Sequence, residues 1–394
     1  MERIHVKVPG EQLQDREYMK QALALAEKGH GWVNPNPMVG AVLVKDGRII
    51  GEGYHTRYGQ LHAEREAFKN AAERGEETAG ADLYVTLEPC CHTGKQPPCT
   101  EAVLASGVKR VIVGCTDPNP VVAGRGIRLL REKGLEVVAG VLRGECERQN
   151  EVFFHFMRTK LPFTVLKYAM TLDGKTATVL GKSQWITGEA ARKRVHEDRG
   201  RYMAILTGVS TVLADNPQLT CRIPGGKNPI RVIADTKLRT PLSSTVVQTA
   251  RETPTWIVTA VSDAGRKKAY EDAGCRVLSV PAKEGELDLQ AMMQLLGEEK
   301  VDSVMVESGG TLAWSFLKAG LVNRVQAYIA PKIFGGAGAP TPVRGTGVDA
   351  PPEAFLLKSR RQCGWERICC WNMRCPVKMH EAVLEREKIA DLKR

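Results

Sequence analysis

Apolar and polar positions alternate along the first 150 residues in two rhythms, one helical and one strand-like. Apolar side chains recur at helical spacing from Met19 to Ala26, which predicts a helix that Asp15 caps and that extends to Lys28. Strand-like runs are expected at 39–44, 49–54, 83–86, 110–114 and 135–139, with further helices from about 62 and over 126–133. The turn Lys45-Asp46-Gly47 joins the first two strands as a hairpin. The alternation predicts an α/β fold in which crossover helices flank a sheet.

The same alternation restarts near residue 160. A helical stretch at 145–158 leads into Thr159-Lys160-Leu161-Pro162, which we interpret as a linker. Strand patterns then recur at 163–169, 204–207, 230–234, 255–259, 301–306 and 325–329, so we predict a second α/β domain. A chain of 394 residues is long enough for two separate cores. We predict domains at 1–158 and 159–375, followed by a basic tail at 376–394.

Amino-acid composition indicates a globular protein and argues against a membrane span or a small disulfide framework. Hydrophobic residues make up 43% and charged residues 26%, the balance of an ordinary globular chain. No run of about 18 apolar residues occurs, and the N-terminal residues lack the apolar core of a secretory signal, so we expect a cytoplasmic protein without a membrane span. The eleven cysteines are spread along the chain, which argues against a small disulfide framework.

The formal net charge of +11 raises the question of nucleic acid as a partner. Residues 358–394 hold ten Lys or Arg against five Asp or Glu, so +5 of the surplus lies in this short stretch. The remaining residues carry +6 over a much longer stretch. A surplus distributed in this way fits a phosphorylated small substrate at least as well as a polymer.

Residues suited to bind a metal ion lie between positions 62 and 99. His62-Ala63-Glu64, Glu88-Pro89-Cys90 and Pro97-Pro98-Cys99 supply one imidazole and two thiolates, which Zn²⁺ accepts in four-coordinate sites. Three protein ligands leave one position for water, as is typical of a catalytic site. We predict His62, Cys90 and Cys99 as the ligands, with Cys91 or His92 as alternatives. His62 and Cys90 are expected at helix starts, and Cys99 follows a proline pair suited to open another.

Glu64 lies two residues beyond His62, where its carboxylate can reach a water molecule at the metal without itself being a ligand. Zinc lowers the pKa of such a water to roughly 7, and Glu64 would take its proton and return it to the leaving ammonia. The pattern resembles the signature of zinc nucleobase deaminases, in which a glutamate acts as acid and base. Glu64 is therefore the predicted catalytic residue.

Longer motifs indicate which kind of deaminase this is. The segments 34–40, 62–64 and 86–99 closely resemble bifunctional riboflavin-biosynthesis deaminase–reductases, and 117–120 with 123–126 fits the same family. Eight residues separate Cys90 from Cys99, as in that family, whereas cytidine and tRNA-adenosine deaminases have Pro-Cys-x-x-Cys. Asn36 is either a pyrimidine contact or part of an ordinary Asn-Pro turn, and His55 is assigned to a loop.

Residues 163–356 resemble the second half of the same family, whose reductase domain is similar to dihydrofolate reductase. Glu307-Ser308-Gly309-Gly310-Thr311 follows a predicted strand and opens a predicted helix, where glycines let backbone N–H groups approach a phosphate. An ordinary strand–helix turn is the alternative. The resemblance implies a cytidine-deaminase-like three-layer α/β/α domain followed by a dihydrofolate-reductase-like α/β domain.

The resemblance also implies two sets of site residues in the second half. Those implied for NADPH are Ala169, Trp185, Thr211, Asp215, Thr236, Gly309, Gly310, Thr311, Leu312, Ala313, Trp314 and Ser315. Those implied for the substrate are Ser183, Arg199, Leu219, Arg222 and Glu307. The planar guanidinium groups of Arg199 and Arg222 suit bidentate phosphate binding. Lys167 and Asp215 are candidates for the general acid, while the cofactor carries the hydride chemistry.

Together the motifs imply two steps of riboflavin biosynthesis. Ammonia is removed from a diaminopyrimidine ribosylamine phosphate to give a uracil, and NADPH then reduces the ribosyl group to ribityl. The expected partners are one Zn²⁺ per chain, NADPH, the phosphorylated pyrimidine and further copies of the chain in a homo-oligomer, with no nucleic acid and no membrane. One rival is a tRNA-type nucleic-acid deaminase with an appended domain, which predicts short cysteine spacing. The other is a non-catalytic zinc-binding interaction protein, against which the intact Glu64 argues.

The C-terminal end departs from this family. Relatives finish the reductase domain with a short strand after a Gly-Asp step, whereas here Gly364 is followed by Trp365-Glu366-Arg367-Ile368-Cys369-Cys370-Trp371. The cysteines of this region lack the paired spacing of a metal site. We therefore expect a diverged or frame-shifted tail that packs poorly against the second domain and leaves the neighbouring strand without its partner.

Overall fold

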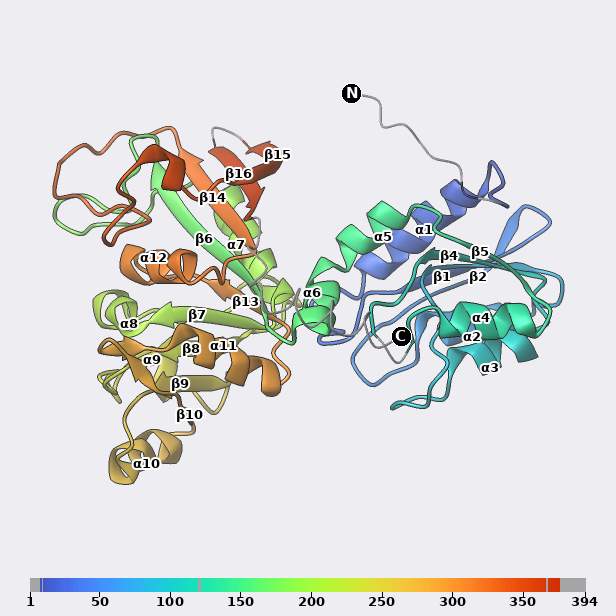
Figure 1. Cartoon of the computed structure of the whole chain (residues 1–394), viewed down its shortest axis with the longest axis horizontal. Coiled ribbons are helices and arrows are strands. Elements are labelled where there is room, and N and C mark those ends of the chain that lie inside the picture. The colour runs from blue at the N-terminus through green and yellow to red at the C-terminus, as the bar shows by residue number, and fades with distance from the viewer. Residues whose placement is uncertain (1–7, 9, 120–121, 366–367, 376–394) are drawn as a thin grey trace, which may run out of the picture. The chain divides into compact units, whose positions relative to one another are not determined.

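The computed structural model describes residues 8, 10–119, 122–365 and 368–375. The chain divides into two compact units, Met1–Lys160 and Leu161–Arg394, and their boundary falls inside the segment interpreted as a linker (Figure 1). Each unit is an α/β structure with a sheet of its own.

The first unit is built on a five-stranded sheet of order β2-β1-β3-β4-β5. Its strands are β1 (Gly40–Lys45), β2 (Arg48–Tyr54), β3 (Asp82–Leu87), β4 (Arg110–Cys115) and β5 (Glu136–Ala139). β1 pairs antiparallel with β2 and β3, while β3, β4 and β5 are parallel. The predicted hairpin is confirmed, because Asp46 and Gly47 adopt positive φ angles of 51° and 75°, which suit a tight two-residue turn.

Helices cover both faces of this sheet. They are α1 (Asp15–Glu27), α2 (Ala63–Glu73), α3 (Cys99–Ala105), α4 (Arg125–Glu132), α5 (Arg143–Gln149) and α6 (Glu151–Thr159). One buried cluster joins α1 and α6 to Val42, and another joins α2 and α4 to Leu43. Neighbouring residues of a strand point to opposite faces, so the sheet lies between two helical layers. The predicted three-layer α/β/α arrangement is confirmed.

Strand glycines bring α2 close to the sheet. A Cβ atom at Gly53 would lie 2.3 Å from the backbone nitrogen of Ala67, and one at Gly51 would lie 2.6 Å from the carbonyl oxygen of the same residue. Any larger residue at either position would push the helix away. The two glycines therefore fix the height of α2, and with it His62, the predicted metal ligand that immediately precedes the helix.

Two local predictions for this unit were wrong. Asp15 does not cap α1 but lies in its first turn, where its buried carboxylate accepts hydrogen bonds from Tyr84 (2.8 Å) and Arg110 (3.1 Å). The single helix expected at 145–158 is divided into α5 and α6 at Asn150. The side chain of Asn150 is buried and hydrogen-bonds a distant part of the chain, which local spacing cannot reveal.

The second unit is built on a nine-stranded sheet, which within the described ranges has the order β10-β9-β8-β7-β13-β6-β14-β16-β15. Its strands are β6 (Phe163–Thr171), β7 (Ala204–Gly208), β8 (Ile230–Ala234), β9 (Thr255–Thr259), β10 (Arg276–Ser279), β13 (Ser303–Val306), β14 (Arg324–Ala330), β15 (Lys358–Trp365) and β16 (Ile368–Arg374). A separate hairpin pairs β11 (Ala282–Lys283) with β12 (Glu286–Leu287). The strands from β10 to β14 in this order are parallel, and all six strands predicted for this half are present.

Helices again pack on both faces. They are α7 (Glu189–Arg201), α8 (Val209–Asp215), α9 (Thr245–Gln248), α10 (Ala264–Asp272), α11 (Leu289–Glu298) and α12 (Gly310–Lys318), with a 3-10 turn η1 (Pro351–Glu353). α11 and α12 share a buried cluster with Leu206 and Val232, whereas α8 and α9 share another with Ile205 and Ile233. The central strands are therefore buried from both sides, as is usual for a parallel sheet.

The expectation for the C-terminal segment was wrong. β16 pairs antiparallel with β14 from Arg374 opposite Arg324 to Cys369 opposite Ile329, and β15 pairs with β16. Cys370 is buried in a cluster with Tyr328. The run of apolar and aromatic residues after Arg367 thus supplies a sheet strand in spite of its unusual sequence. The predicted tail at 376–394 lies outside the described residues.

Candidate active sites in the two units

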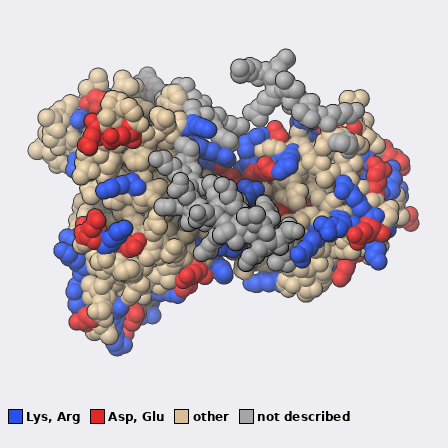
Figure 2. Space-filling view, viewed as in Figure 1, with Lys and Arg blue, Asp and Glu red and all other residues tan. Residues whose placement is uncertain are grey.

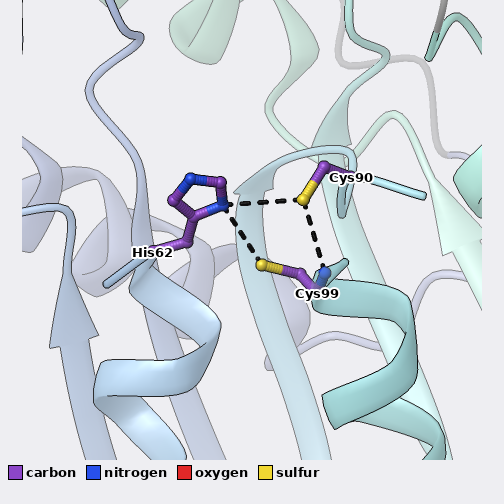
Figure 3. Close-up of side chains that lie close together, drawn as sticks. All are labelled: His62, Cys90 and Cys99. Carbon is purple, nitrogen blue, oxygen red and sulfur yellow. Dashed lines mark hydrogen bonds between the residues drawn. The ribbon is translucent and has the colours of Figure 1, made fainter. Parts of the chain in front are cut away.

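The three residues predicted as metal ligands lie together in the first unit. Nδ1 of His62 lies 3.5 Å from Sγ of Cys90 and 3.3 Å from Sγ of Cys99, and all three donor atoms lie within 4.8 Å of one another (Figure 3). On a tetrahedral zinc, with Zn–S of about 2.3 Å and Zn–N of about 2.0–2.1 Å, a nitrogen and a sulfur ligand are separated by about 3.6 Å. The donor set and its spacing therefore fit zinc.

Each ligand is held by a different local structure. His62 is the residue immediately before α2, and Cys99 is the first residue of α3, as expected. Cys90 is not at a helix start, which corrects the prediction, but lies in the loop after β3. Its sulfur nevertheless accepts a hydrogen bond from the backbone N–H of Cys99 (3.3 Å). A hydrogen bond from the Cys99 thiol, followed by those from His62 and from the backbone N–H of Cys99, lowers the pKa of Cys90 against the opposing effect of burial.

Glu64 lies in the first turn of α2 and is 3% exposed. Burial raises the pKa of its carboxyl group, and the nearby Cys90 acts in the same direction. The carboxyl group also lies within hydrogen-bonding reach of the Cys99 thiol. A buried carboxyl beside the metal ligands suits transfer of a proton at this place.

Glu88 fixes the loop that carries Cys90. Its buried carboxylate accepts hydrogen bonds from the backbone N–H groups of Asp117 (3.2 Å), Gly124 (2.8 Å) and Ile127 (3.2 Å). A Cβ atom at Gly126 would lie 2.1 Å from the carbonyl oxygen of Pro89, so the start of α4 packs directly on this loop. Burial raises the pKa of the neighbouring Asp117 to about 6. The motif Glu88-Pro89-Cys90 does not by itself indicate this role of Glu88.

Asn36 lies beside the metal site. The Nδ1–H of His55 donates to the carbonyl oxygen of Leu61 (2.9 Å), which leaves Nε2 to accept a hydrogen bond from the side-chain amide of Asn36 (3.1 Å). Burial lowers the pKa of His55 and favours this neutral form. The ring of His55 packs edge-on against His62. His55, which sequence reasoning assigned only to a loop, thus links Asn36 to the metal ligands.

Asn150 anchors the segment that carries Asn36. Its Oδ1 accepts from the N–H of Met38 and its Nδ2 donates to the carbonyl of Met38, both at 2.8 Å. The sequence offered no signal for this contact, because Asn150 lies 112 residues further along the chain.

In the second unit, Glu307 is the centre of a charged cluster. It accepts two hydrogen bonds from Arg199 (2.8 and 3.1 Å) and one from Nζ of Lys167 (3.2 Å). Burial alone would raise the pKa of Glu307, but the charges of Arg199 and Lys167 hold it well below its usual range. Two cations against one anion leave a local positive surplus that suits a phosphorylated ligand.

Two further residues implied for the substrate lie close to this cluster. Nη1 of Arg199 donates to the carbonyl oxygen of Thr220 (3.1 Å), in the same loop as Leu219 and Arg222. The side chain of Arg222 is exposed, whereas that of Leu219 is 4% exposed in the core, so Leu219 can offer a ligand only its backbone. Burial, followed by the charges of Arg199 and Arg222, lowers the pKa of His196 to about 4. Ser183 is half-buried in the loop between β6 and α7.

The residues implied for NADPH share one edge of the sheet. Ala169 lies near the end of β6, Thr211 and Asp215 lie on α8 after β7, Thr236 follows β8, and 309–315 follows β13. These are carboxyl ends of adjacent parallel strands, the usual position of a nucleotide site in such sheets. Trp185 is 60% exposed and carries the guanidinium of Arg192 over its ring.

The two glycines of the 307–311 turn differ in surroundings. A Cβ atom at Gly310 would lie 2.7 Å from the carbonyl oxygen of Thr341, so this glycine is required for packing of the 341–344 loop. A Cβ atom at Gly309 would have no other heavy atom within 4 Å. Of these two glycines, Gly309 is the one that a ligand can approach closely.

Family models match both units. Residues 12–115 match the cytidine and deoxycytidylate deaminase zinc-binding region, and residues 162–369 match the RibD C-terminal domain. The riboflavin biosynthesis protein RibD of Actinobacillus pleuropneumoniae is 49% identical over 87% of this chain and 91% of its own length. RibD of Escherichia coli is 43% identical over 82% of this chain and 89% of its own length.

Solved structures agree with these relatives. The Thermotoga maritima diaminohydroxyphosphoribosylaminopyrimidine deaminase/5-amino-6-(5-phosphoribosylamino)uracil reductase superposes with a TM-score of 0.81 at 40% identity, covering 92% of this chain and 99% of its own. Acinetobacter baumannii RibD gives a TM-score of 0.81 at 35% identity, covering 92% and 98%. None of the helices in the described ranges has the length and apolar character needed to cross a bilayer. Basic and acidic side chains intermingle on both units over the face drawn in Figure 2.

Proposed function

The chain belongs to the RibD family of bifunctional riboflavin-biosynthesis deaminase–reductases, and we propose which of its residues perform the two reactions. It is a zinc-dependent deaminase and an NADPH-dependent reductase of riboflavin biosynthesis. Its folds are cytidine-deaminase-like in the first unit and dihydrofolate-reductase-like in the second. The substrate of the deaminase is a diaminopyrimidine ribosylamine phosphate, and that of the reductase is the corresponding uracil.

The deaminase step uses His62, Cys90 and Cys99 as zinc ligands. The observation that carries this proposal is the convergence of one nitrogen and two sulfur donors within 4.8 Å beside a buried carboxyl group. Zinc, when bound, activates water as the nucleophile. Glu64 takes the proton of the attacking water and delivers it to the leaving ammonia. Asn36, oriented by His55, presents its side-chain oxygen to the pyrimidine.

The reductase step uses the carboxyl edge of the second sheet. NADPH supplies the hydride and lies along Ala169, Trp185, Thr211, Asp215, Thr236 and 309–315. Glu307 holds Arg199 and Lys167 in fixed positions, and Arg199 with Arg222 binds the phosphorylated substrate. Lys167 is favoured over Asp215 as the general acid, because it is a cation among the substrate-side residues whereas Asp215 lies on the cofactor side.

We also propose that the protein acts in the cytoplasm as a homo-oligomer. The cysteines with described side chains are free thiols, in keeping with a reducing compartment. Exposed apolar side chains of the second unit, among them Leu172 and Ile333, support self-association. Sedimentation equilibrium tests the oligomer, and a purely monomeric species at working concentration would contradict it.

One assay tests the two activities together. Purified protein is incubated with the diaminopyrimidine substrate, with and without NADPH, while ammonia release and NADPH oxidation are followed. We expect ammonia in both reactions, loss of ammonia after zinc chelation and recovery on adding zinc. NADPH oxidation should occur only once deaminated product has formed. Ammonia release that survives complete removal of zinc would contradict the proposed deaminase site.

A further inference from the structure

Arg231 is a buried cation in the middle of the second sheet. It lies on β8 between β7 and β9, and its side chain is fully shielded from solvent. Burial lowers the pKa of its guanidinium to about 10. None of the ion pairs in the described part of the chain includes Arg231.

Neutral oxygen atoms surround the guanidinium group in place of a carboxylate. Nε donates to Oγ1 of Thr255 (2.9 Å), and Nη1 donates to Oγ1 of Thr249 (2.8 Å) and the carbonyl of Gln218 (3.2 Å). Nη2 donates to the carbonyls of Thr249 (3.0 Å) and Thr253 (2.8 Å). The charge of Glu252 acts on this group only from beyond ion-pair distance, so the five hydrogen bonds are what offset the cost of burying it.

Four of the five bonds end on the 249–255 segment, and the fifth ends on the substrate-side loop. Gln218 lies in the stretch 216–222, which contains two non-glycine residues with positive φ, Asn216 (39°) and Leu219 (55°). Such backbone conformations persist only where the surrounding structure holds them. Arg231 holds this loop through the carbonyl of Gln218, and Arg199 holds it at a second point, the carbonyl of Thr220.

We propose that Arg231 is a positioning residue of the reductase reaction, which fixes the backbone of Gln218 and thereby sets the loop that carries Leu219 and Arg222. Arg231 does not touch the substrate. It acts through the loop. The planar guanidinium group is needed because one side chain must donate hydrogen bonds to Gln218 and to the 249–255 segment at the same time. The catalytic consequence rests on the proposed function, in which this loop faces the phosphorylated substrate.

The test compares Arg231→Lys and Arg231→Gln with Thr255→Val in the full-length protein. Neither replacement of Arg231 can span both groups of acceptors, and Arg231→Gln buries no charge, so it serves if Arg231→Lys does not fold. Thr255→Val is the matched control, because it removes one acceptor of the guanidinium and leaves the bond to Gln218. Hydrogen exchange of the backbone amides in 216–222, where Pro217 has none, and reductase kinetics on the phosphorylated uracil are measured for each.

In the Arg231 variants we expect faster amide exchange at 216–222. The Michaelis constant for the uracil substrate should rise about tenfold, because a displaced loop costs the substrate the charge-assisted hydrogen bond from Arg222, which is worth about that factor. The Michaelis constant for NADPH and the deaminase rate should stay unchanged. Thr255→Val should lower the unfolding temperature of the second unit without moving the Michaelis constant.

Two results would overturn the proposal. One is a folded Arg231 variant with native exchange at 216–222, and the other is a Thr255→Val variant whose Michaelis constant rises as much as that of Arg231→Lys. If exchange at 216–222 rises while neither Arg231→Lys nor Arg222→Ala alters substrate binding, the loop is held as inferred and the proposed substrate placement is what fails.

Discussion

Shortening the chain after Gly364 should unfold the second unit. The cut removes β16, which pairs with β14 over the six residues from Arg324 to Ile329. In an antiparallel ladder every other pair exchanges two hydrogen bonds, so about six backbone bonds are lost. At about 1 kcal/mol each, the loss is about 6 kcal/mol, within the total stability of 5–15 kcal/mol that is typical of a domain. Burial of Cys370 is lost in addition.

The measurement is thermal unfolding by calorimetry, with reductase and deaminase activity followed in parallel. We expect the transition of the second unit to disappear or to fall by tens of degrees, since 1 kcal/mol corresponds to about 2–4 °C for a domain of this size. The transition of the first unit and ammonia release should persist. A chain cut after Cys375, which keeps both strands, is the control. An unchanged reductase after the cut at Gly364 would refute the assignment of β16 to the sheet.

Three substitutions test the sites. Glu64→Gln should reduce ammonia release by about 10²–10⁴-fold while zinc content by metal analysis and reductase activity stay normal; loss of zinc would instead indicate a ligand. Arg222→Ala should raise the Michaelis constant for the uracil substrate about tenfold or more and leave that for NADPH unchanged, and an equal loss with a dephosphorylated substrate would place its action elsewhere. His196→Asn should flatten the pH dependence of unfolding of the second unit. The pKa of His196 is about 4 in the folded protein and about 6.5 in the unfolded chain, so between these pH values only the unfolded chain binds the proton. The stability of the folded protein therefore falls as the pH drops from about 6.5 to about 4. Identical pH profiles for the two proteins would show that His196 does not contribute.

Sequence patterns predicted the helices and strands that are determined by residues close to one another in the chain. The helix at Asp15 and the six strands of the second half follow from the spacing of apolar side chains along a few turns or a single strand. His62, Cys90 and Cys99 could be predicted to lie together because imidazole and thiolate groups have a metal-binding chemistry that is specific regardless of context. The zinc site is therefore the part of the protein that its sequence describes best.

What the sequence could not predict depends on contacts between distant segments. Arg231 sits in a strand pattern where a charged residue is expected to face solvent, but helices on both faces of the sheet leave it no such face. Leu219 stays a predicted substrate residue, but its buried side chain, which the sequence did not indicate, leaves only its backbone for a ligand. β16 was missed because a departure from the family motif was taken as loss of the strand, although pairing needs backbone groups and not a particular sequence.

The clamp between Asn150 and Met38 has a consequence for how the protein is made. Asn150 leaves the ribosome 112 residues after Met38, which at about 5–20 residues per second is about 6–22 s later. All three metal ligands are synthesised within that interval. The nascent chain therefore contains all three predicted metal ligands before Asn150 can fix the segment that carries Asn36.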